Sequence, residues 1–280
     1  MLYLQRDWMS SCLTVALLSV AGVFLSFSFA ALGADQEPPP PPAQVLPEAM
    51  TDENTGFNTI FDGKTLKDWD GDPQYWRVED GAIVGETTDK NLPKYNSFII
   101  WRGGKPADFE IKLEYRISAM GNSALQYRSS ELPGTKWVLR GYQADIDGAE
   151  WGKMFYERFA KPKGLELRRV TAQNYEERGR TFLALPGQLA YVGSGRIQRA
   201  IASLGNTDDL ARSVSDDWNR LYLIVRGDQM IHILNDRVMS IVIDDDKANR
   251  RMEGYLGMQI HVGPAMKAEF RNIRLKTLSR

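Results

Sequence analysis

Cysteine is almost absent from this chain, and its single copy, Cys12, lies inside an apolar N-terminal stretch. A chain cleaved after that stretch has no thiol, which excludes disulfides, cysteine metal sites and thiol catalysis in the mature protein. No metalloprotease, P-loop, dinucleotide-binding or nucleophile-elbow motif occurs either. An excess of one charge is also lacking, because 35 Lys and Arg face 36 Asp and Glu. We therefore expect no nucleic-acid partner and a ligand that is small or neutral.

An uncharged apolar stretch spans residues 13–32 and is followed by Gly33. Small residues at Ala31 and Gly33 predict a signal peptide over residues 1–33, cleaved after Gly33. About 20 apolar residues can also span a bilayer, so an uncleaved N-terminal anchor is the alternative. Both interpretations predict an exported protein, periplasmic or extracellular, whose contact with a membrane is limited to this segment.

Five consecutive prolines, residues 38–42, follow the apolar stretch. Polyproline extends without backbone hydrogen bonds, so residues 34–55 are predicted to be a linker. The remaining residues, 56–280, are about the right number for one large folded domain.

The folded part has mainly a period of two in its apolar residues. In residues 109–117, five apolar side chains alternate with four charged ones, as in a half-buried strand. Residues 221–226, 230–234 and 238–243 predict a three-stranded meander. The apolar parity shifts between Phe270 and Ile273, which predicts a β-bulge. Helical periodicity is scarce, with residues 208–213 the best short candidate, so the chain is predicted to be all-β, an antiparallel β-sandwich with few short helices.

Three further predicted strands carry amides and ionisable groups on their second face. These side chains are Gln126 and Arg128 in residues 124–128, Gln143, Asp145 and Asp147 in residues 142–147, and Gln259 and His261 in residues 255–262. Alternate residues of a strand point to one face, so each set is expected to share a surface suited to hydroxyl-rich ligands. The alternative is an ordinary solvated strand face.

Two other polar features have simpler interpretations. His232 alternates with Met230 and Leu234 and is expected to be a packed structural histidine. Residues 244–246, three consecutive aspartates, are expected to form a charged turn facing water. A calcium site there is the alternative, although oxygen ligands alone do not specify one.

Several short segments occur in a characteristic order. They are IFDGKTL (60–66) with Trp69, WRVEDG (76–81) with Gly85, GNS (121–123), QYR (126–128), GYQADI (141–146), YEERGR (175–180), WN (218–219), GMQIH (257–261) and FRNI (270–273). In this order they resemble the 3-keto-disaccharide hydrolase domain family over residues 56–279. The resemblance implies a jelly-roll sandwich of the concanavalin A-like lectin/glucanase type. Residues 151–173 look like an insertion relative to the family pattern, expected to cap or reshape the site.

The resemblance also implies an exported hydrolase that cleaves glycosides, disaccharides among them, whose sugar is oxidised at C3. A 3-keto group acidifies the C2 hydrogen, so a base can remove it, the C1 substituent can leave by elimination, and water can then add. Such a site needs a base, an acid and a group that stabilises the enolate.

Candidate residues for these roles follow from the resemblance and the polar faces together. The catalytic candidates are Arg128, Asp145, Glu177 and His261, with Arg128 expected to hold developing negative charge. The candidates for binding the sugar are Asn122, Gln126, Gln143, Asp147, Glu176 and Gln259. No cofactor is expected, and a divalent metal held through Asp145, His261 or Glu177 is left open as an alternative electrophile.

Rival functions remain open at this point. Direct glycosidase chemistry needs two carboxyls flanking the bond; Asp145 and Asp147 point the same way, whereas Asp145 with Glu177 would be able to flank it. The same sandwich serves non-catalytic carbohydrate-binding modules, and a structural exoprotein on a polyproline stalk is a third class.

Overall fold

The computed structural model of the protein describes residues 54–163 and 169–279. The predicted signal peptide or anchor, residues 1–33, and nearly all of the predicted linker, residues 34–55, lie outside the described residues. Within them, the helices are all too short, or not apolar enough, to cross a membrane.

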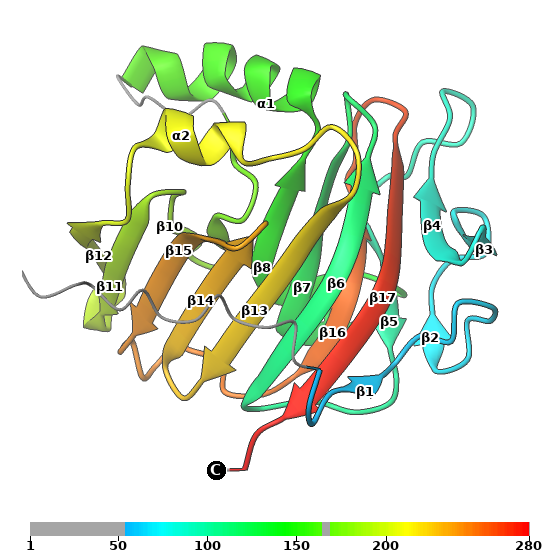
Figure 1. The fold of residues 1–280 in the computed structure, drawn as a ribbon, viewed down its shortest axis with the longest axis horizontal. Helices are drawn as coiled ribbons and strands as arrows, with labels where there is room; N and C mark the ends of the chain where they lie inside the picture. The colour runs from blue at the N-terminus through cyan, green and yellow to red at the C-terminus, as the bar shows by residue number, and fades with distance from the viewer. Residues whose placement is uncertain (1–53, 164–168, 280) are drawn as a thin grey trace, which may run out of the picture. The chain divides into compact units, whose positions relative to one another are not determined.

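Two stacked β-sheets form the fold (Figure 1). In the ten-stranded sheet, β12, β11, β15, β14, β13, β6, β17, β4 and β3 lie in that order, and β1 pairs with β17. Their bounds are β1 Asn58–Thr59, β3 Trp76–Glu79, β4 Ala82–Glu86, β6 Phe109–Ile117, β11 Gln188–Gly193, β12 Ile197–Ser203, β13 Asn219–Arg226, β14 Gln229–Leu234, β15 Arg237–Asp244 and β17 Lys267–Thr277.

The seven-stranded sheet has the order β10, β9, β8, β7, β16, β5 and β2. Its strands are β2 Trp69–Asp70, β5 Ser97–Trp101, β7 Asn122–Glu131, β8 Leu139–Asp147, β9 Asn174–Glu177, β10 Thr181–Ala184 and β16 Tyr255–Ile260. Among the described strands every pair is antiparallel except β11 with β15. The predicted antiparallel β-sandwich is confirmed.

The strands predicted from periodicity form where expected. β6 has the bounds predicted for residues 109–117, and β13, β14 and β15 form the predicted meander. The register of β17 against β6 shifts between Arg271 and Arg274, which is the predicted bulge. The predicted short helix is α2, Thr207–Arg212, and the side chain of Asn206 caps it by accepting from the backbone N–H groups of residues 208 and 209.

The hydrophobic core lies between the two sheets. The apolar side chains of β6 pack against Leu125 and Tyr127 of β7 and against Tyr142 of β8. These three side chains are buried. Burying a large apolar side chain stabilises the fold by about 1.5–3 kcal/mol, so this face fixes which residues of β7 and β8 point outward. His232 is buried in the same core with Nε2 2.9 Å from the Tyr127 hydroxyl, which confirms its structural role.

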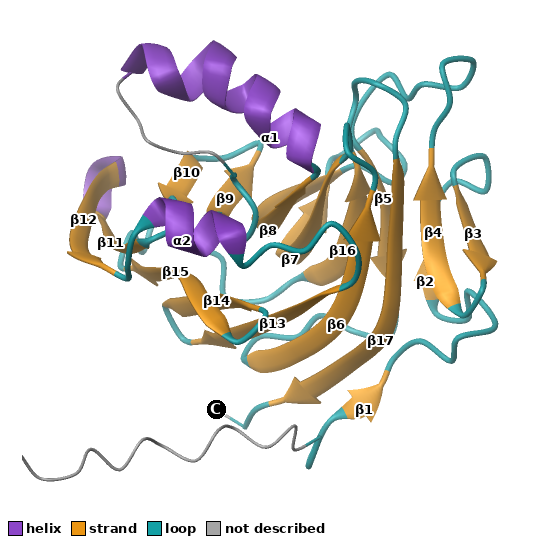
Figure 2. Ribbon diagram, turned by 45° about the horizontal axis from the view of Figure 1, so that its top comes forward, coloured by secondary structure: helices purple, strands orange, loops and turns teal. Residues whose placement is uncertain are grey.

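A helical segment follows β8 where an insertion was expected. It consists of α1, Ala149–Phe155, a π-helical turn, Tyr156–Ala160, and a 3₁₀ turn, Lys161–Lys163. Figures 1 and 2 both show this segment beside β8, β9 and β10. Its aromatic residues Phe155 and Tyr156 pack against Val170 and Leu185, which ties it to the sandwich.

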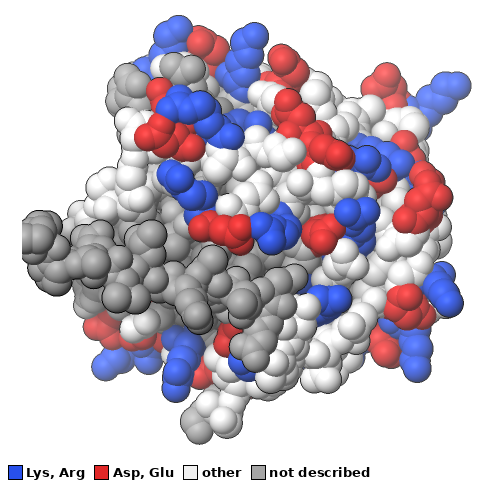
Figure 3. Space-filling view, in the orientation of Figure 1, with Lys and Arg blue, Asp and Glu red and all other residues white. Residues whose placement is uncertain are grey.

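The charged residues are spread over the surface. On the face seen in Figure 3, Lys and Arg side chains alternate with Asp and Glu side chains. This mixture agrees with the nearly zero net charge of the sequence.

Candidate active site

The candidate site lies on the face of the seven-stranded sheet that is turned away from the core. Cross-strand pairing places Phe182, Tyr175, Gln143, Gln126 and Gly257 in one row across β10, β9, β8, β7 and β16. Directly paired residues share a face of a sheet, so this row is aromatic at one end and polar at the other. The expected outward placement of Gln126 and Gln143 is thereby confirmed.

The sheet curls strongly toward this face. Asn96, immediately before β5, donates from Nδ2 to Glu177 Oε1 on β9 at 3.3 Å. Four strand-to-strand steps of about 4.8 Å would separate these positions by about 19 Å on a flat sheet. Leu139 of β8 likewise reaches over Gly257 of β16, where an added Cβ would lie 2.9 Å from Leu139 Cδ1. The curl therefore encloses the polar row instead of leaving it on an open surface.

Five enclosed polar side chains form what we call the amide–carboxylate cluster. Its members are Gln126, Gln143, Asp145, Gln173 and Gln259, and each is at most 7% exposed. Gln259 Nε2 donates to Gln143 Oε1 at 3.4 Å, and Gln126 Nε2 donates to the Gly141 carbonyl at 3.3 Å. The hydrogen bonds within such a buried cluster fix the orientations of its side chains.

Asp145 is the ionisable centre of the cluster. The side-chain amides of Gln143 and Gln173 donate to its two oxygens, one to each. Burial raises the pKa of Asp145 to about 7, and the charge of Glu177 acts in the same direction, whereas the two amide donors oppose the shift. A carboxyl with a pKa near 7 is suited to exchanging a proton at neutral pH.

Glu177 is the second carboxyl at the site. Besides the bond from Asn96, its Oε1 lies 3.8 Å from Arg178 Nε. Burial raises its pKa, and Arg178 and the Asn96 donor reduce that rise. The structure thus places Asp145 and Glu177 close enough for the charge of one to affect the other.

His261 follows β16 and faces the helical segment. Its ring is 5.2 Å from the ring of Trp151 in α1, at an interplanar angle of 65°. Burial lowers the pKa of His261, so the imidazole is neutral at pH 7. A neutral imidazole can either donate or accept a proton, depending on its tautomer.

Several buried polar atoms around this site have no hydrogen-bond partner among the described residues. They are Oε1 of Gln126, Gln173 and Gln259, Nδ1 of His261 and Nε1 of Trp151. Leaving a buried polar atom without a partner costs about 1–3 kcal/mol. Three carbonyl acceptors in the cluster, and an indole donor beside His261, are groups with which a polyhydroxylated ligand would pair.

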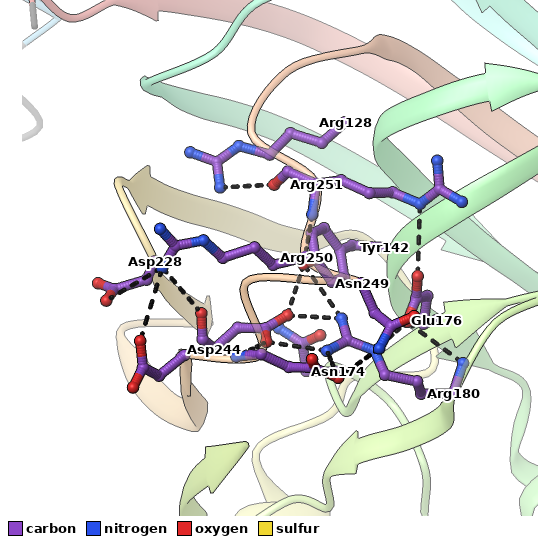
Figure 4. Close-up of polar contacts among 12 residues, drawn as sticks. Arg128, Tyr142, Asn174, Glu176, Arg180, Asp228, Asp244, Asn249, Arg250 and Arg251 are labelled. Atoms are coloured by element: carbon purple, nitrogen blue, oxygen red, sulfur yellow. Dashed lines mark hydrogen bonds and ion pairs between the residues drawn. The ribbon is translucent and has the colours of Figure 1, made fainter. Parts of the chain in front are cut away.

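Arg128 is not part of this cluster. Its side chain does not lie on the same face as Gln126, so the predicted orientation is wrong. The register of β7 shifts between Tyr127 and Ser130, and Arg128 has a φ of 44°. The guanidinium donates to the carbonyls of Ala107, Gly227 and Arg251 and pairs with Asp108 at 3.0 Å. Figure 4 shows it directed at the backbone of Arg251. A bulge reverses the parity on which the prediction rested.

Glu176 also lies elsewhere, in a buried ionic network at the edge of the core. Its carboxylate pairs with Arg180 at 2.5 Å and with Arg251 at 3.3 Å. Arg180 also pairs with Asp244 at 2.5 Å and with Asp246 at 3.5 Å (Figure 4). Glu176 therefore points to the core side of β9 while Glu177 points to the site, and the predicted substrate contact by Glu176 is not supported by its position.

The same network corrects the expectation for residues 244–246. Asp244 and Asp246 are each 1% exposed, so this segment is not a water-facing turn. The pairing with Arg180 explains how two carboxylates are accommodated there.

Asp147 and Asn122 pair across the end of β8 and β7, beyond the cluster. Asp147 is fully buried, accepts from Arg169 Nε at 3.2 Å, and is bonded to the Thr171 hydroxyl. Asn122 is half-buried. Asp147 is thus held by its own partners, and Asn122 lies nearest the end of the site that contains His261.

Four residues of the site were not predicted from the sequence: Asn96, Trp151, Gln173 and Tyr175. Asn96, Trp151 and Gln173 come from loops or the insertion, where strand parity has no meaning. Tyr175 had a usable signal, because it has the same parity as Glu177 in the predicted YEERGR segment. Burial raises the pKa of Tyr175 to about 12, and the charges of Glu177 and Asp145 act in the same direction.

Within residues 54–163 and 169–279, no group of three or more His, Cys, Asp or Glu side chains is arranged to hold a metal ion. The predicted alternative of a metal at Asp145, His261 or Glu177 thus has no preformed three-ligand set in the described part of the chain.

The fold and this face together define a curled two-sheet β-sandwich with an enclosed set of amides and carboxyls. The sequence profile of the 3-keto-alpha-glucoside-1,2-lyase-like domain matches residues 56–276, and the chain belongs to this family. The resemblance found in the motif order is confirmed.

One relative and two solved structures are similar to this chain. A 3-keto-disaccharide hydrolase of Bacteroides thetaiotaomicron is 34% identical over 88 residues, which cover 28% of this chain and 29% of that protein. The match thus spans less than a third of that relative's length. Two provisionally assigned glycosyl hydrolases of Parabacteroides distasonis have related structures. The first has a TM-score of 0.50 and 16% identity, covering 79% of this chain and 99% of that one. The second has a TM-score of 0.49 and 19% identity, covering 82% and 98%. At these identities the first likeness shows the fold alone.

Proposed function

We propose that this protein is an enzyme that cleaves glycosides whose sugar is oxidised at C3, by elimination across C1–C2 followed by hydration. The observation that carries the proposal is Asp145, a buried carboxyl with a pKa near 7 that two amides orient inside an enclosed polar face. Family membership and the printed activity of the Bacteroides relative support the same chemistry. Export, carried only by the apolar stretch at residues 13–32, is part of the proposal.

Asp145 acts as the base in this proposal. Its carboxylate takes the C2 proton, the electron pair forms the enolate of the C3 ketone, and the C1–O bond then breaks with the leaving group carrying the pair away. The acid form of Asp145 then exchanges its proton with solvent, water adds at C1, and Asp145 delivers a solvent-derived proton to C2. A base whose pKa is close to the working pH serves both steps, because it holds the proton only transiently.

Glu177 and His261 supply the acid and the polar stabilisation. The raised pKa of Glu177 favours its protonated form, which can donate to the departing oxygen. His261 is neutral, and its neighbour Trp151 offers a buried N–H without a partner among the described residues. An indole donor and a neutral imidazole next to each other would stabilise the enolate oxygen in the role once assigned to Arg128.

The amides hold the sugar. The free carbonyl oxygens of Gln126, Gln173 and Gln259 accept from hydroxyl groups of the ring, and this pairing removes the cost of leaving them unpartnered. A binding module without chemistry would use the same acceptors, so turnover is the property that separates the two functions.

The test uses the full-length protein with a 3-keto-disaccharide and, in parallel, the unoxidised sugar, with and without a chelator. We expect cleavage of the keto sugar only. Asp145→Asn should lower turnover by about 10²–10⁴-fold, the usual contribution of a positioned base. Asp236→Asn, an exposed carboxyl paired with Arg220, is the matched control and should retain full activity. Binding of both sugars without turnover would contradict the enzyme and favour a carbohydrate-binding module.

A further inference from the structure

Aromatic side chains lead away from the amide–carboxylate cluster toward the protein surface. Tyr175 and Phe182 have ring centroids 5.2 Å apart, Phe182 and Phe155 are 6.4 Å apart, and Phe155 and Phe159 are 5.4 Å apart. We call these four residues the aromatic strip. It joins β9 and β10 to the helical segment that the family pattern did not lead us to expect.

The strip is continuous with the candidate active site. Tyr175 pairs directly with Gln143 across β9 and β8, and Phe182 is the next residue in the same row. Phe182 therefore lies two strand spacings, about 10 Å, from Gln143 along the row. A ligand whose sugar occupies the cluster would place a group attached at one end of that sugar on Tyr175 and Phe182.

The exposed part of the strip lacks groups that bind hydroxyls. Phe159 is 47% exposed, Phe182 is 36% exposed, and Met154 in the same helical segment is 36% exposed. Phenylalanine, unlike tyrosine and tryptophan, has no polar group at its tip. A second sugar ring lying there would lose water from its hydroxyls without gaining hydrogen bonds, whereas an aromatic ring would not.

We propose that the aromatic strip binds the leaving group, and that the preferred substrates are 3-keto-glycosides of aromatic alcohols. This inference rests on the function proposed above and narrows its substrate class from disaccharides to aryl-bearing glycosides. Tyr175 contacts both halves of such a substrate, Phe182 contacts only the leaving group, and Phe155 and Phe159 extend the strip beyond it.

The test compares benzyl 3-keto-glucoside with a 3-keto-disaccharide of the same anomeric configuration, using the full-length protein. Benzyl alkoxide is not a better leaving group than a sugar alkoxide, so a preference in kcat/KM reports binding. We expect about a ten-fold preference for the benzyl substrate, the effect of one or two aromatic contacts. Phe182→Ala should abolish most of that preference, because KM for the benzyl substrate should rise more than KM for the disaccharide. Ile201→Ala, another exposed apolar residue, is the control and should preserve the preference.

Equal or greater activity on the disaccharide, or an unchanged preference in Phe182→Ala, would overturn the inference while leaving the proposed function intact. If neither keto substrate is cleaved, the proposed function fails, and equilibrium binding of unreacted benzyl glucoside decides the inference separately. About ten-fold weaker binding to Phe182→Ala than to Ile201→Ala would support the aromatic subsite, and equal binding would contradict it.

Discussion

Asp145 is the residue on which the proposed chemistry depends. Its carboxylate must be ionised to accept the C2 proton, and burial sets its pKa near 7. We therefore expect a bell-shaped pH dependence of kcat/KM, because the active form needs Asp145 without its proton and Glu177 with the proton that it donates to the leaving group. Glu177→Gln cannot ionise, so turnover should be lower and the decline at high pH should disappear. The measurement is a pH–rate profile of both proteins; a decline at high pH that persists in Glu177→Gln would contradict the role of Glu177 as the acid.

The buried position of His232 leads to a separate prediction about the pH dependence of stability. Burial lowers its pKa to about 4, compared with about 6.5 in the unfolded chain. A lowered histidine pKa means that the unfolded state takes up the proton first, so its contribution to stability is present above pH 6.5 and is lost as the pH falls to 4. The loss amounts to about 3 kcal/mol.

Urea unfolding between pH 4 and pH 7 measures this loss. His232→Gln should be less stable at pH 7, because the Tyr127 hydroxyl loses one of its two partners, and should show a flatter dependence on pH. His261→Gln, which changes the only other histidine, should keep most of the wild-type dependence. A pH dependence that is identical in wild type and His232→Gln would disprove the assignment.

At the residue scale, strand parity predicted some placements and failed at others for identifiable reasons. Gln126, Gln143 and Asp145 lie in regular strands with a buried opposite face, so alternation alone orients them. Arg128 sits in a bulge, where alternation reverses. Glu176 and Glu177 are adjacent, and only the structure shows which of the two points to the core.

At the scale of elements, the turn between β9 and β10 is tied to the end of β15 by buried charges. Arg180 is 2% exposed at its side chain and pairs with Glu176 and Asp244. Removing one partner leaves buried carboxylates unpaired, so Arg180→Met is expected to lower the free energy of unfolding by about 3–5 kcal/mol.

Denaturant unfolding of Arg180→Met checks this expectation beside Arg220→Ala, which breaks an exposed ion pair with Asp236. The exposed pair should change stability by less than about 1 kcal/mol. Similar losses of stability in both variants would show that the buried network contributes no more to stability than an exposed ion pair.

Elements were predictable where their pattern was regular. The meander β13–β15 and the bulge in β17 follow from apolar spacing, because each of these strands has one face in the core. The helical segment after β8 has only a short pattern: Trp151, Phe155 and Phe159 lie four residues apart on one side of it. This spacing was visible in the sequence but is too short to predict a helix by itself.

At the scale of the whole molecule, the curl of the seven-stranded sheet creates the site. Nothing in the sequence of a single strand encodes this curl, because it results from contacts between distant residues such as Asn96 and Glu177. The antiparallel sandwich was therefore predictable from the sequence, whereas the enclosure of the polar face was not. That enclosure is what raises the pKa of Asp145.

The most direct test of the account is the cleavage of a 3-keto-glycoside by the full-length protein in D₂O, with the deuterium content at C2 of the released 3-keto-sugar measured by mass spectrometry or NMR. Elimination followed by hydration returns a solvent-derived hydrogen to C2, so we predict one deuterium there in each product molecule. Free 3-keto-sugar incubated for the same time without protein corrects for spontaneous exchange. Product that retains its original C2 hydrogen would contradict the elimination route and point to direct displacement at C1.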